Sequence, residues 1–353
     1  MLLRLIFLIV VAACVAWPGD LGSSSGALSA PEPARAAAPA APPQLARRLQ
    51  GMAAGFQGHV GLAVTDLRDG WTYAFNGEGR FSQESVAKLW TVIAVLDAVD
   101  SGRLQIEEQI PITWADLSVF HQPIAERIGA KVMIAELVRV AIVDSDNAAN
   151  DILVRRLGGT SAVQAVIRRK GLDGIVAGIQ QRELQARIAG LSWSPALNGG
   201  ERLEAARSRL DVSVREAAMR SYLADPDDGA TPVGMVRALA ALNAGRLLSP
   251  ASTERLLRLM HSTVHGEERL NGGLQRGWTL AHKTGTGQRL GDLRVGVNDV
   301  GVLTAPDGHA YAVAVFVGSS TQPMSVDEGL MRRVADAIVD SWRAGGGQDG
   351  AGG

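Results

Sequence analysis

Strand patterns at both ends of the chain enclose a long middle section with helical patterns. Two β-rich runs come early, at 58–65 and 71–75, and three come late, at 278–282, 299–303 and 311–317. Strands that are segregated from helices along a chain are typical of α+β folds. We therefore predict an α+β fold with one five-stranded antiparallel sheet built from both chain ends. Helices would flank this sheet, and an all-helical subdomain would be inserted between its two halves.

Six segments of the middle section have apolar residues at helical spacing. They are 86–101, 134–142, 148–157, 161–170, 201–223 and 232–244. Two terminal helices are expected at 44–54 and 327–342, where they would cover the apolar strand at 311–317. The long segment 198–228 has apolar residues spaced like one face of a helix, so we expect an inserted helix there.

The composition excludes several classes of protein. The 353 residues include 35 Lys and Arg, 36 Asp and Glu and one cysteine, and the formal net charge is −1. This balance, with 5% aromatic residues, lacks the basic surface and the stacking platforms that nucleic-acid binding needs. One cysteine forms no internal disulfide, and no Cys/His cluster offers a set of zinc ligands. We expect no nucleic-acid partner, no metal, no other cofactor, and a monomer.

The two ends of the chain predict export and tethering rather than folding. Residues 1–17 hold one early cation and then an apolar run too short to span a bilayer, as in a secretory signal peptide. An Ala/Pro-rich flexible spacer is expected at 18–43 and a disordered Gly-rich tail at 345–353. We thus expect a secreted or periplasmic protein without a transmembrane segment. Cys14 ends a stretch that resembles a lipobox, so a lipid anchor at Cys14 and an ordinary leader cysteine both stay open.

The sequence Ser85-Val86-Ala87-Lys88 stands at the start of an apolar helical segment. Its serine and lysine are three positions apart, so on a helix their side chains share one face. A serine hydroxyl becomes a good nucleophile when a neighbour removes its proton, and a lysine can do this where burial and nearby cations lower its pKa. The spacing predicts a nucleophile and its base, although the isolated pattern is also typical of a solvated helix face.

Two more polar motifs follow. Ser145-Asp146-Asn147 lies between two helical segments, where a hydroxyl and an amide could relay a proton and bind a substrate amide. The alternative for this tripeptide is a helix cap with polar turn residues. The sequence KTGTG at 283–287 ends a predicted strand, and its glycines permit close approach of a substrate backbone. The alternative there is a glycine turn with an exposed lysine.

In this order, the three motifs resemble the signature set of class A serine β-lactamases and penicillin-binding proteins. The resemblance extends over about residues 44–342, and Phe120 falls where class A enzymes have an aromatic side chain at the cleft mouth. It implies a β-lactamase-like catalytic domain at 44–344 that forms an acyl-enzyme. Ser85 would attack the carbonyl carbon, with Lys88 as its base. Ser145 and Lys283 would pass a proton to the departing nitrogen.

The resemblance also implies how the substrate is held. The main-chain N–H groups of Ser85 and Thr286 would form the oxyanion hole. The side chains implied in substrate binding are Asn147 for an amide, Lys283, Thr284 and Thr286 for a carboxylate, and Phe120 at the cleft mouth. Arg289 and Arg294 would either add a cation at the carboxylate or serve only as surface charges.

The sequence departs from class A at the glutamate that activates the deacylating water. Ungapped spacing from Ser145 places Gln181 at that position, and a glutamine can hold a water but does not accept its proton. In this register the acyl-enzyme should be long-lived. Glu183, two residues on, offers a carboxylate after a small rearrangement. The sequence SPALN at 194–198 also resembles this loop, with serine in place of the glutamate.

We expect a secreted hydrolase of the class A type that opens the amide bond of β-lactam antibiotics. The same motifs fit a D-alanyl-D-alanine carboxypeptidase or related penicillin-binding protein that acts on D-Ala-D-Ala peptides. They also fit a β-lactam receptor that deacylates slowly. Gln181 favours the latter two functions, whereas the class A style of the helical subdomain favours the first.

Overall fold

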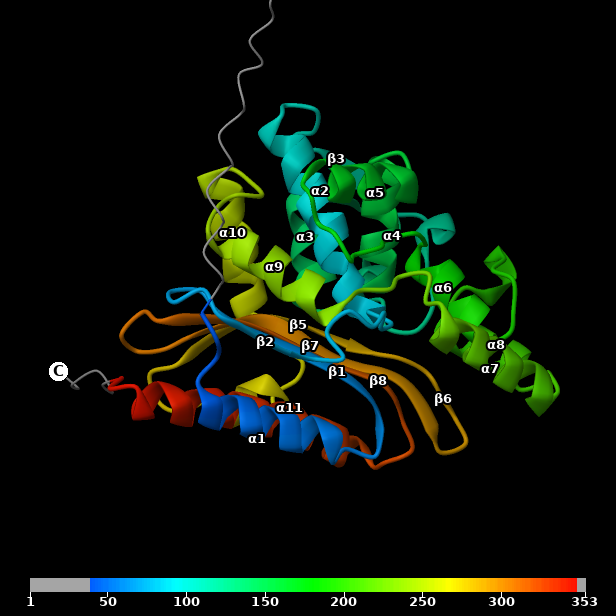
Figure 1. Cartoon of the computed structure of the whole chain (residues 1–353). Coiled ribbons are helices and arrows are strands. Elements are labelled where there is room, and N and C mark those ends of the chain that lie inside the picture. The colour runs from blue at the N-terminus through cyan, green and yellow to red at the C-terminus, as the bar shows by residue number, and fades with distance from the viewer. Residues whose placement is uncertain (1–38, 348–353) are drawn as a thin grey trace, which may run out of the picture. The chain divides into compact units, whose positions relative to one another are not determined.

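The computed structural model describes residues 39–347 and shows one main sheet between two helical layers (Figure 1). Five strands lie in the order β2-β1-β8-β7-β5, and every neighbouring pair is antiparallel. A short sixth strand pairs with β7. The strands are β1 (Gly58–Asp66), β2 (Thr72–Phe75), β5 (Thr279–Thr286), β6 (Arg289–Leu290), β7 (Leu293–Thr304) and β8 (Ala310–Ser320). The prediction of an α+β fold with a sheet built from both chain ends is confirmed.

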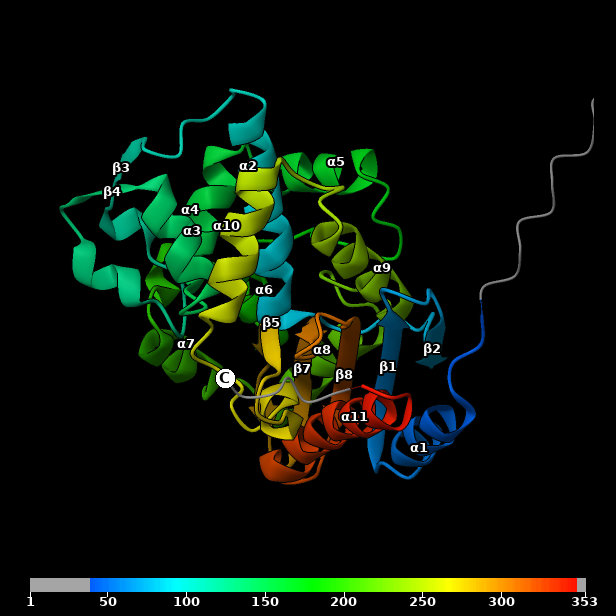
Figure 2. The same ribbon diagram turned by 90° about the vertical axis from the view of Figure 1, so that its left-hand side faces the viewer.

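Strand β8 lies at the centre of the sheet and is buried on both faces. Its valines at 313, 315 and 317 pack with the terminal helices α1 (Pro43–Ala54) and α11 (Met324–Ala344). The alternate residues Ala312, Ala314 and Phe316 join the core of the helical subdomain. Successive side chains of a strand point to opposite faces, so an apolar run serves two cores at once. Figure 2 shows α1 and α11 side by side on the sheet face away from the other helices.

The helical subdomain is built around α2 (Lys88–Asp100), which is buried on all sides. A helix that is apolar all round needs neighbours in every direction. The helices around it are α3 (Ile134–Ile142), α4 (Asn147–Arg156), α5 (Thr160–Arg169) and α10 (Pro250–His261). Helix α9 (Pro232–Asn243) packs on strands β1 and β8 of the sheet. Short 3₁₀ turns complete the chain: η1 (Glu84–Ala87), η2 (Trp114–Asp116), η3 (Pro123–Arg127), η4 (Pro195–Leu197) and η5 (Leu270–Gly273).

The structure differs from the sequence-based expectation in four places. The inserted segment forms two helices, α7 (Gly200–Arg207) and α8 (Val212–Ala224), where one was expected at 201–223. Helix α6 (Gln181–Ile188) occupies a stretch expected to be loop, and α10 and the hairpin of β3 (Gln109–Pro111) and β4 (Lys131–Met133) were not anticipated. Helix α6 begins where the Asp151 carboxylate accepts two main-chain N–H groups, from Gln181 at 2.8 Å and Arg182 at 3.0 Å. A cap supplied thirty residues away leaves no local pattern.

No helix within residues 39–347 is long and apolar enough to cross a bilayer. The expected signal peptide at 1–17, residues 18–38 of the expected spacer, Cys14 and residues 348–353 of the expected tail lie outside the described part of the chain.

Candidate active site

Ser85 and Lys88 lie where turn η1 runs into α2. Lys88 is fully buried, and its Nζ donates a hydrogen bond to Ser85 Oγ at 2.6 Å. The same amine donates to Asn147 Oδ1 at 2.7 Å and lies 3.4 Å from Ser145 Oγ. The structure therefore brings the first two sequence motifs together around one amine.

Burial governs the protonation of Lys88. Removal from water lowers its pKa to about 8, although Asp146, Asp151 and Glu84 act in the opposite direction. With this pKa, about a tenth of the molecules hold a neutral amine at pH 7. Such an amine can accept the proton of the neighbouring hydroxyl.

Lys283 brings the third motif to the same place from β5. Its Nζ donates to Ser145 Oγ at 2.9 Å and to the main-chain oxygen of Thr284 at 3.1 Å. Burial and, after it, the charge of Lys88 lower the pKa of Lys283 well below its usual value. Ser145 thus lies between two buried amines, in a continuous polar chain from Ser85 to Lys283.

Asp146, the middle residue of its motif, holds the loop rather than the substrate. Its buried carboxylate accepts the main-chain N–H of Ala149 at 2.8 Å and that of Ile124 at 2.6 Å. The first contact caps α4, and the second ties this corner to turn η3. Asp146 is therefore the helix cap of this motif, whereas Asn147 and Ser145 contact the buried amines of Lys88 and Lys283.

A cleft of about 570 Å³ opens over these groups. Its lining includes Ser85, Ser145, Asn147, Phe120, Gln181, Thr284 and Thr286. Non-glycine residues with positive φ among the described residues are Asn76, Glu84, Phe120 and Ser145. Three of the four lie at this cleft or directly beside Ser85, and backbone strain of this kind gathers at functional sites.

Arg269 is a site residue that the sequence analysis missed. Its guanidinium donates to Thr286 Oγ1 at 2.7 Å and to the main-chain oxygens of Gly285 and Asn298 at 3.0 and 2.9 Å, and it lines the cleft. No motif surrounds it in the sequence, so only the fold reveals its place. Arg289 also lines the cleft and pairs with Asp292. Arg294 instead pairs with buried Asp327.

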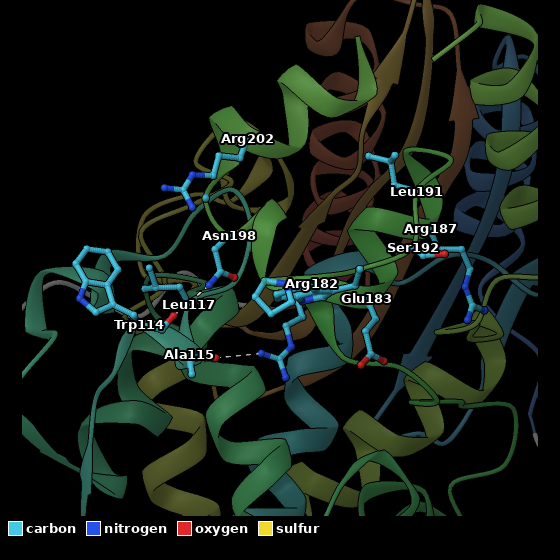
Figure 3. A pocket seen from close by; sticks show the side chains of 13 residues that line it. Trp114, Ala115, Leu117, Arg182, Glu183, Arg187, Leu191, Ser192, Asn198 and Arg202 are labelled. Carbon is cyan, nitrogen blue, oxygen red and sulfur yellow. Dashed lines mark hydrogen bonds between the residues drawn. The ribbon is translucent and has the colours of Figure 1, made fainter. Parts of the chain in front are cut away.

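The structure separates the two residues considered for water activation. Gln181 is buried, lines the cleft, and has an amide oxygen without a hydrogen-bond partner among the described residues. Glu183 is exposed and lines a second cavity of about 1080 Å³ with Trp114, Arg182 and Trp193 (Figure 3). Residues two apart on a helix point in nearly opposite directions, so of these two residues only Gln181 lines the cleft with Ser85. The alternative match of this loop to residues 194–198 also lies away from Ser85, because Pro195 and Asn198 line the second cavity.

Within the described part of the chain, no three ligand-type side chains of the cleft lie close enough to share a metal ion. Among residues 39–347, the one group of three ligand-type side chains close enough to share an ion is Asp66, Asp69 and His309. It lies at the turn between β1 and β2, where the Asp66 carboxylate is already paired with His309 Nε2 at 2.8 Å.

Comparison with known proteins gives a consistent result. The model of a family described as "Beta-lactamase enzyme family" matches residues 44–342. The β-lactamase VEB-1 of Pseudomonas aeruginosa is 27% identical over 284 residues, which cover 78% of this chain and 83% of that protein. A β-lactamase crystal structure from Chitinophaga pinensis is 30% identical, with a TM-score of 0.69 over 84% of this chain and 99% of its own. An ancestral class A β-lactamase is 28% identical, with a TM-score of 0.67 over 84% of this chain and 100% of its own.

Proposed function

Because this chain belongs to the β-lactamase enzyme family, with class A enzymes among its relatives, we propose that it opens the amide ring of β-lactam antibiotics through an acyl-enzyme on Ser85. The observation that carries this proposal is the convergence of Ser85, Lys88, Ser145 and Lys283 on one cleft. These are a nucleophile, a base and a proton relay within hydrogen-bond reach of one another.

Acylation begins when neutral Lys88 accepts the proton of Ser85. The Ser85 oxygen then forms a bond to the lactam carbonyl carbon, and negative charge gathers on the carbonyl oxygen. The main-chain N–H groups of Ser85 and Thr286 stabilise this oxyanion, and loss of one such donor typically costs about 3 to 4 kcal/mol. The carbon–nitrogen bond breaks next. Ser145 gives its proton to the departing nitrogen and is reprotonated by Lys283 or Lys88.

The substrate carboxylate beside the lactam nitrogen lies at the end of β5 in this proposal. Lys283, Thr284 and Thr286 supply hydrogen bonds there, and Arg269, which pairs with Glu328 at 3.4 Å, lies behind Thr286. Charge-assisted hydrogen bonds are about twice as strong as neutral ones. Asn147 holds the side-chain amide, and Phe120 forms the wall of the cleft mouth.

Deacylation is the slow step in this proposal. Gln181 occupies the position beside the acyl group, and its amide orients a water without accepting the proton. The position of Gln181 also favours a second candidate function, in which the protein is a D-alanyl-D-alanine carboxypeptidase or a slowly deacylating β-lactam receptor.

We also propose that the protein is exported through the leader at 1–17, with or without a lipid on Cys14, and that it is a monomer.

One experiment separates these functions. The chain without its leader is mixed with benzylpenicillin, and turnover and intact mass are recorded together, with Ser85→Ala as the control. Turnover, with an adduct that disappears once the free benzylpenicillin is consumed, supports the β-lactamase. A lasting adduct on Ser85 with cleavage of D-Ala-D-Ala peptides supports the carboxypeptidase, and one without cleavage supports the receptor. Absence of both turnover and adduct refutes the acyl-enzyme.

A further inference from the structure

Glu84, the residue directly before Ser85, has its carboxyl group buried beneath the catalytic turn. It is 1% exposed and has a φ of 54°, which is unusual for a residue with a side chain. Glycines make room for it, because a Cβ at Gly296 would lie 2.6 Å from Glu84 Cγ, and one at Gly287 would lie 2.6 Å from Oε1. The absence of side chains at Gly287 and Gly296 thus leaves the space that the Glu84 side chain occupies.

The hydroxyl of Tyr222, on the inserted helix α8, bridges Glu84 to a second buried carboxyl group. The Tyr222 oxygen lies 3.0 Å from Glu84 Oε1 and 2.9 Å from Asp228 Oδ1. A phenol carries one hydrogen, so it donates to only one carboxylate at a time. The other close oxygen–oxygen contact is a hydrogen bond only if that carboxyl group is itself protonated. Two full hydrogen bonds at these distances therefore need two hydrogens among the three groups.

The surroundings decide which carboxyl group holds the second hydrogen. Asp228 Oδ2 accepts the main-chain N–H of Glu84 at 2.6 Å, which favours its ionised form. Burial raises the pKa of Glu84 to about 8, with the Asp228 charge as the next cause, and burial raises the pKa of Asp228 less, to about 6. Burial also raises the pKa of Tyr222 well above its usual value, so the phenol stays protonated. The Gln185 amide, which donates to Glu84 Oε2, and the charge of Lys88 lower the pKa of Glu84, but burial outweighs them.

We propose that Glu84 is a positioning residue whose neutral carboxyl group donates to Tyr222, which donates to Asp228, and that this chain of hydrogen bonds holds the Ser85 turn in its reactive geometry. The proposal rests on the proposed function, since it assumes Ser85 as the nucleophile. Ionisation of Glu84 places two negative charges in one dry space and breaks the contact with Tyr222. The neighbouring Ser85 then loses its alignment with Lys88.

This proposal gives the inserted segment 198–228 a role. Tyr222 on α8 reaches the residue before the nucleophile, and Gln185 on α6 donates to Glu84 Oε2 at 2.8 Å. Gln288 in turn donates to Gln185 and accepts from Arg207 on α7. The two inserted helices are thereby joined to the catalytic turn through side-chain hydrogen bonds.

The test uses Glu84→Gln, which imitates the neutral acid: its amide can donate to Tyr222 and accept from Gln185. Adduct formation with benzylpenicillin is followed by mass from pH 6 to 10. The wild-type rate should rise and then fall above about pH 8, whereas the variant should keep within about threefold of the wild-type rate at pH 7 and stay level at high pH. Tyr222→Phe should lower the rate at least about tenfold, because Asp228 loses its donor and the Glu84 carboxyl group loses its acceptor. Tyr73→Phe is the matched control, since its hydroxyl contacts Gln50 on the other face of the sheet.

A second readout does not depend on activity. Glu84 binds its proton more tightly in the folded state than in the unfolded state, where its pKa is near 4.5. Its contribution to stability is therefore fully present below that value and is lost as the pH rises to about 8. The melting temperature of Glu84→Gln relative to wild type should climb over this interval.

The two readouts separate the possible failures. Suppose that wild type forms no adduct, but the melting temperature of Glu84→Gln relative to wild type climbs with pH as described. The proposed function is then wrong, whereas the protonated state of buried Glu84 is supported. If wild type forms the adduct and Glu84→Gln follows the wild-type pH dependence in both readouts, the positioning proposal is wrong. It is also wrong if Tyr222→Phe forms the adduct as fast as the control Tyr73→Phe.

Discussion

The amine of Lys88 lies 2.6 Å from the hydroxyl oxygen of Ser85, and the lysine is fully buried. Asn147 holds the amine from α4, and the buried carboxylate of Asp228 accepts the main-chain N–H of Glu84 in the turn that carries the hydroxyl. A base held this close removes a proton without a prior rearrangement.

Replacing Lys88 with methionine should slow acylation of Ser85 by about 10²- to 10⁴-fold, the range typical of a lost general base. Methionine suits a buried site, so the fold should survive. In wild type the acylation rate should rise as the pH approaches 8, because burial lowers the pKa of Lys88 to about that value. Stopped-flow measurement of acylation checks both statements. An unchanged rate in Lys88→Met would assign the base to another group.

Gln181→Glu should shorten the life of the acyl-enzyme by at least about tenfold, since a carboxylate can accept the proton of the attacking water. Glu183→Gln is the matched control and should change nothing, because Glu183 lines the second cavity. The lifetime of the adduct is measured by intact mass after removal of free β-lactam. The opposite pattern, with hydrolysis lost in Glu183→Gln alone, would require α6 to turn during catalysis.

Arg269→Gln should raise KM for a carboxylate-bearing β-lactam by about 10- to 100-fold, the equivalent of one charge-assisted hydrogen bond. Arg289→Gln should alter KM by less than about threefold, because exposed ion pairs such as that with Asp292 contribute little. Steady-state kinetics at two ionic strengths distinguish the variants. Equal effects from both would mean that the long-range field, rather than a specific contact, attracts the substrate.

Ile338→Ala should lower the free energy of unfolding by about 2 to 5 kcal/mol, because Ile338 is fully buried between α11 and the sheet. Val326, on the same helix, is 38% exposed, and Val326→Ala should cost less than about 0.5 kcal/mol. Urea unfolding measures both. Similar losses in the two variants would show that α11 does not seal this face of the sheet in solution.

Local chemistry sufficed for the predictions that depend on near neighbours. The spacing of Ser85 and Lys88 already implied their contact, because residues three apart on a helical turn share a face. The apolar strand at 311–317 implied cover on both faces, and β8 has it. These features depend on backbone periodicity, which is readable without any knowledge of the fold.

The amino-acid sequence by itself determined most of the strands and helices and the three motifs that meet at the cleft, but not α6, α10 or the hairpin of β3 and β4. Only the tertiary structure decided that Gln181 rather than Glu183 faces Ser85, that Arg269 stands behind Thr286, and that Tyr222 joins Glu84 to Asp228. The reason is physical: the contact of Tyr222 with Glu84 spans 138 positions, and the cap on α6 comes from Asp151. Such pairings depend on how the whole sheet and its helices pack, and no short window of sequence contains both partners.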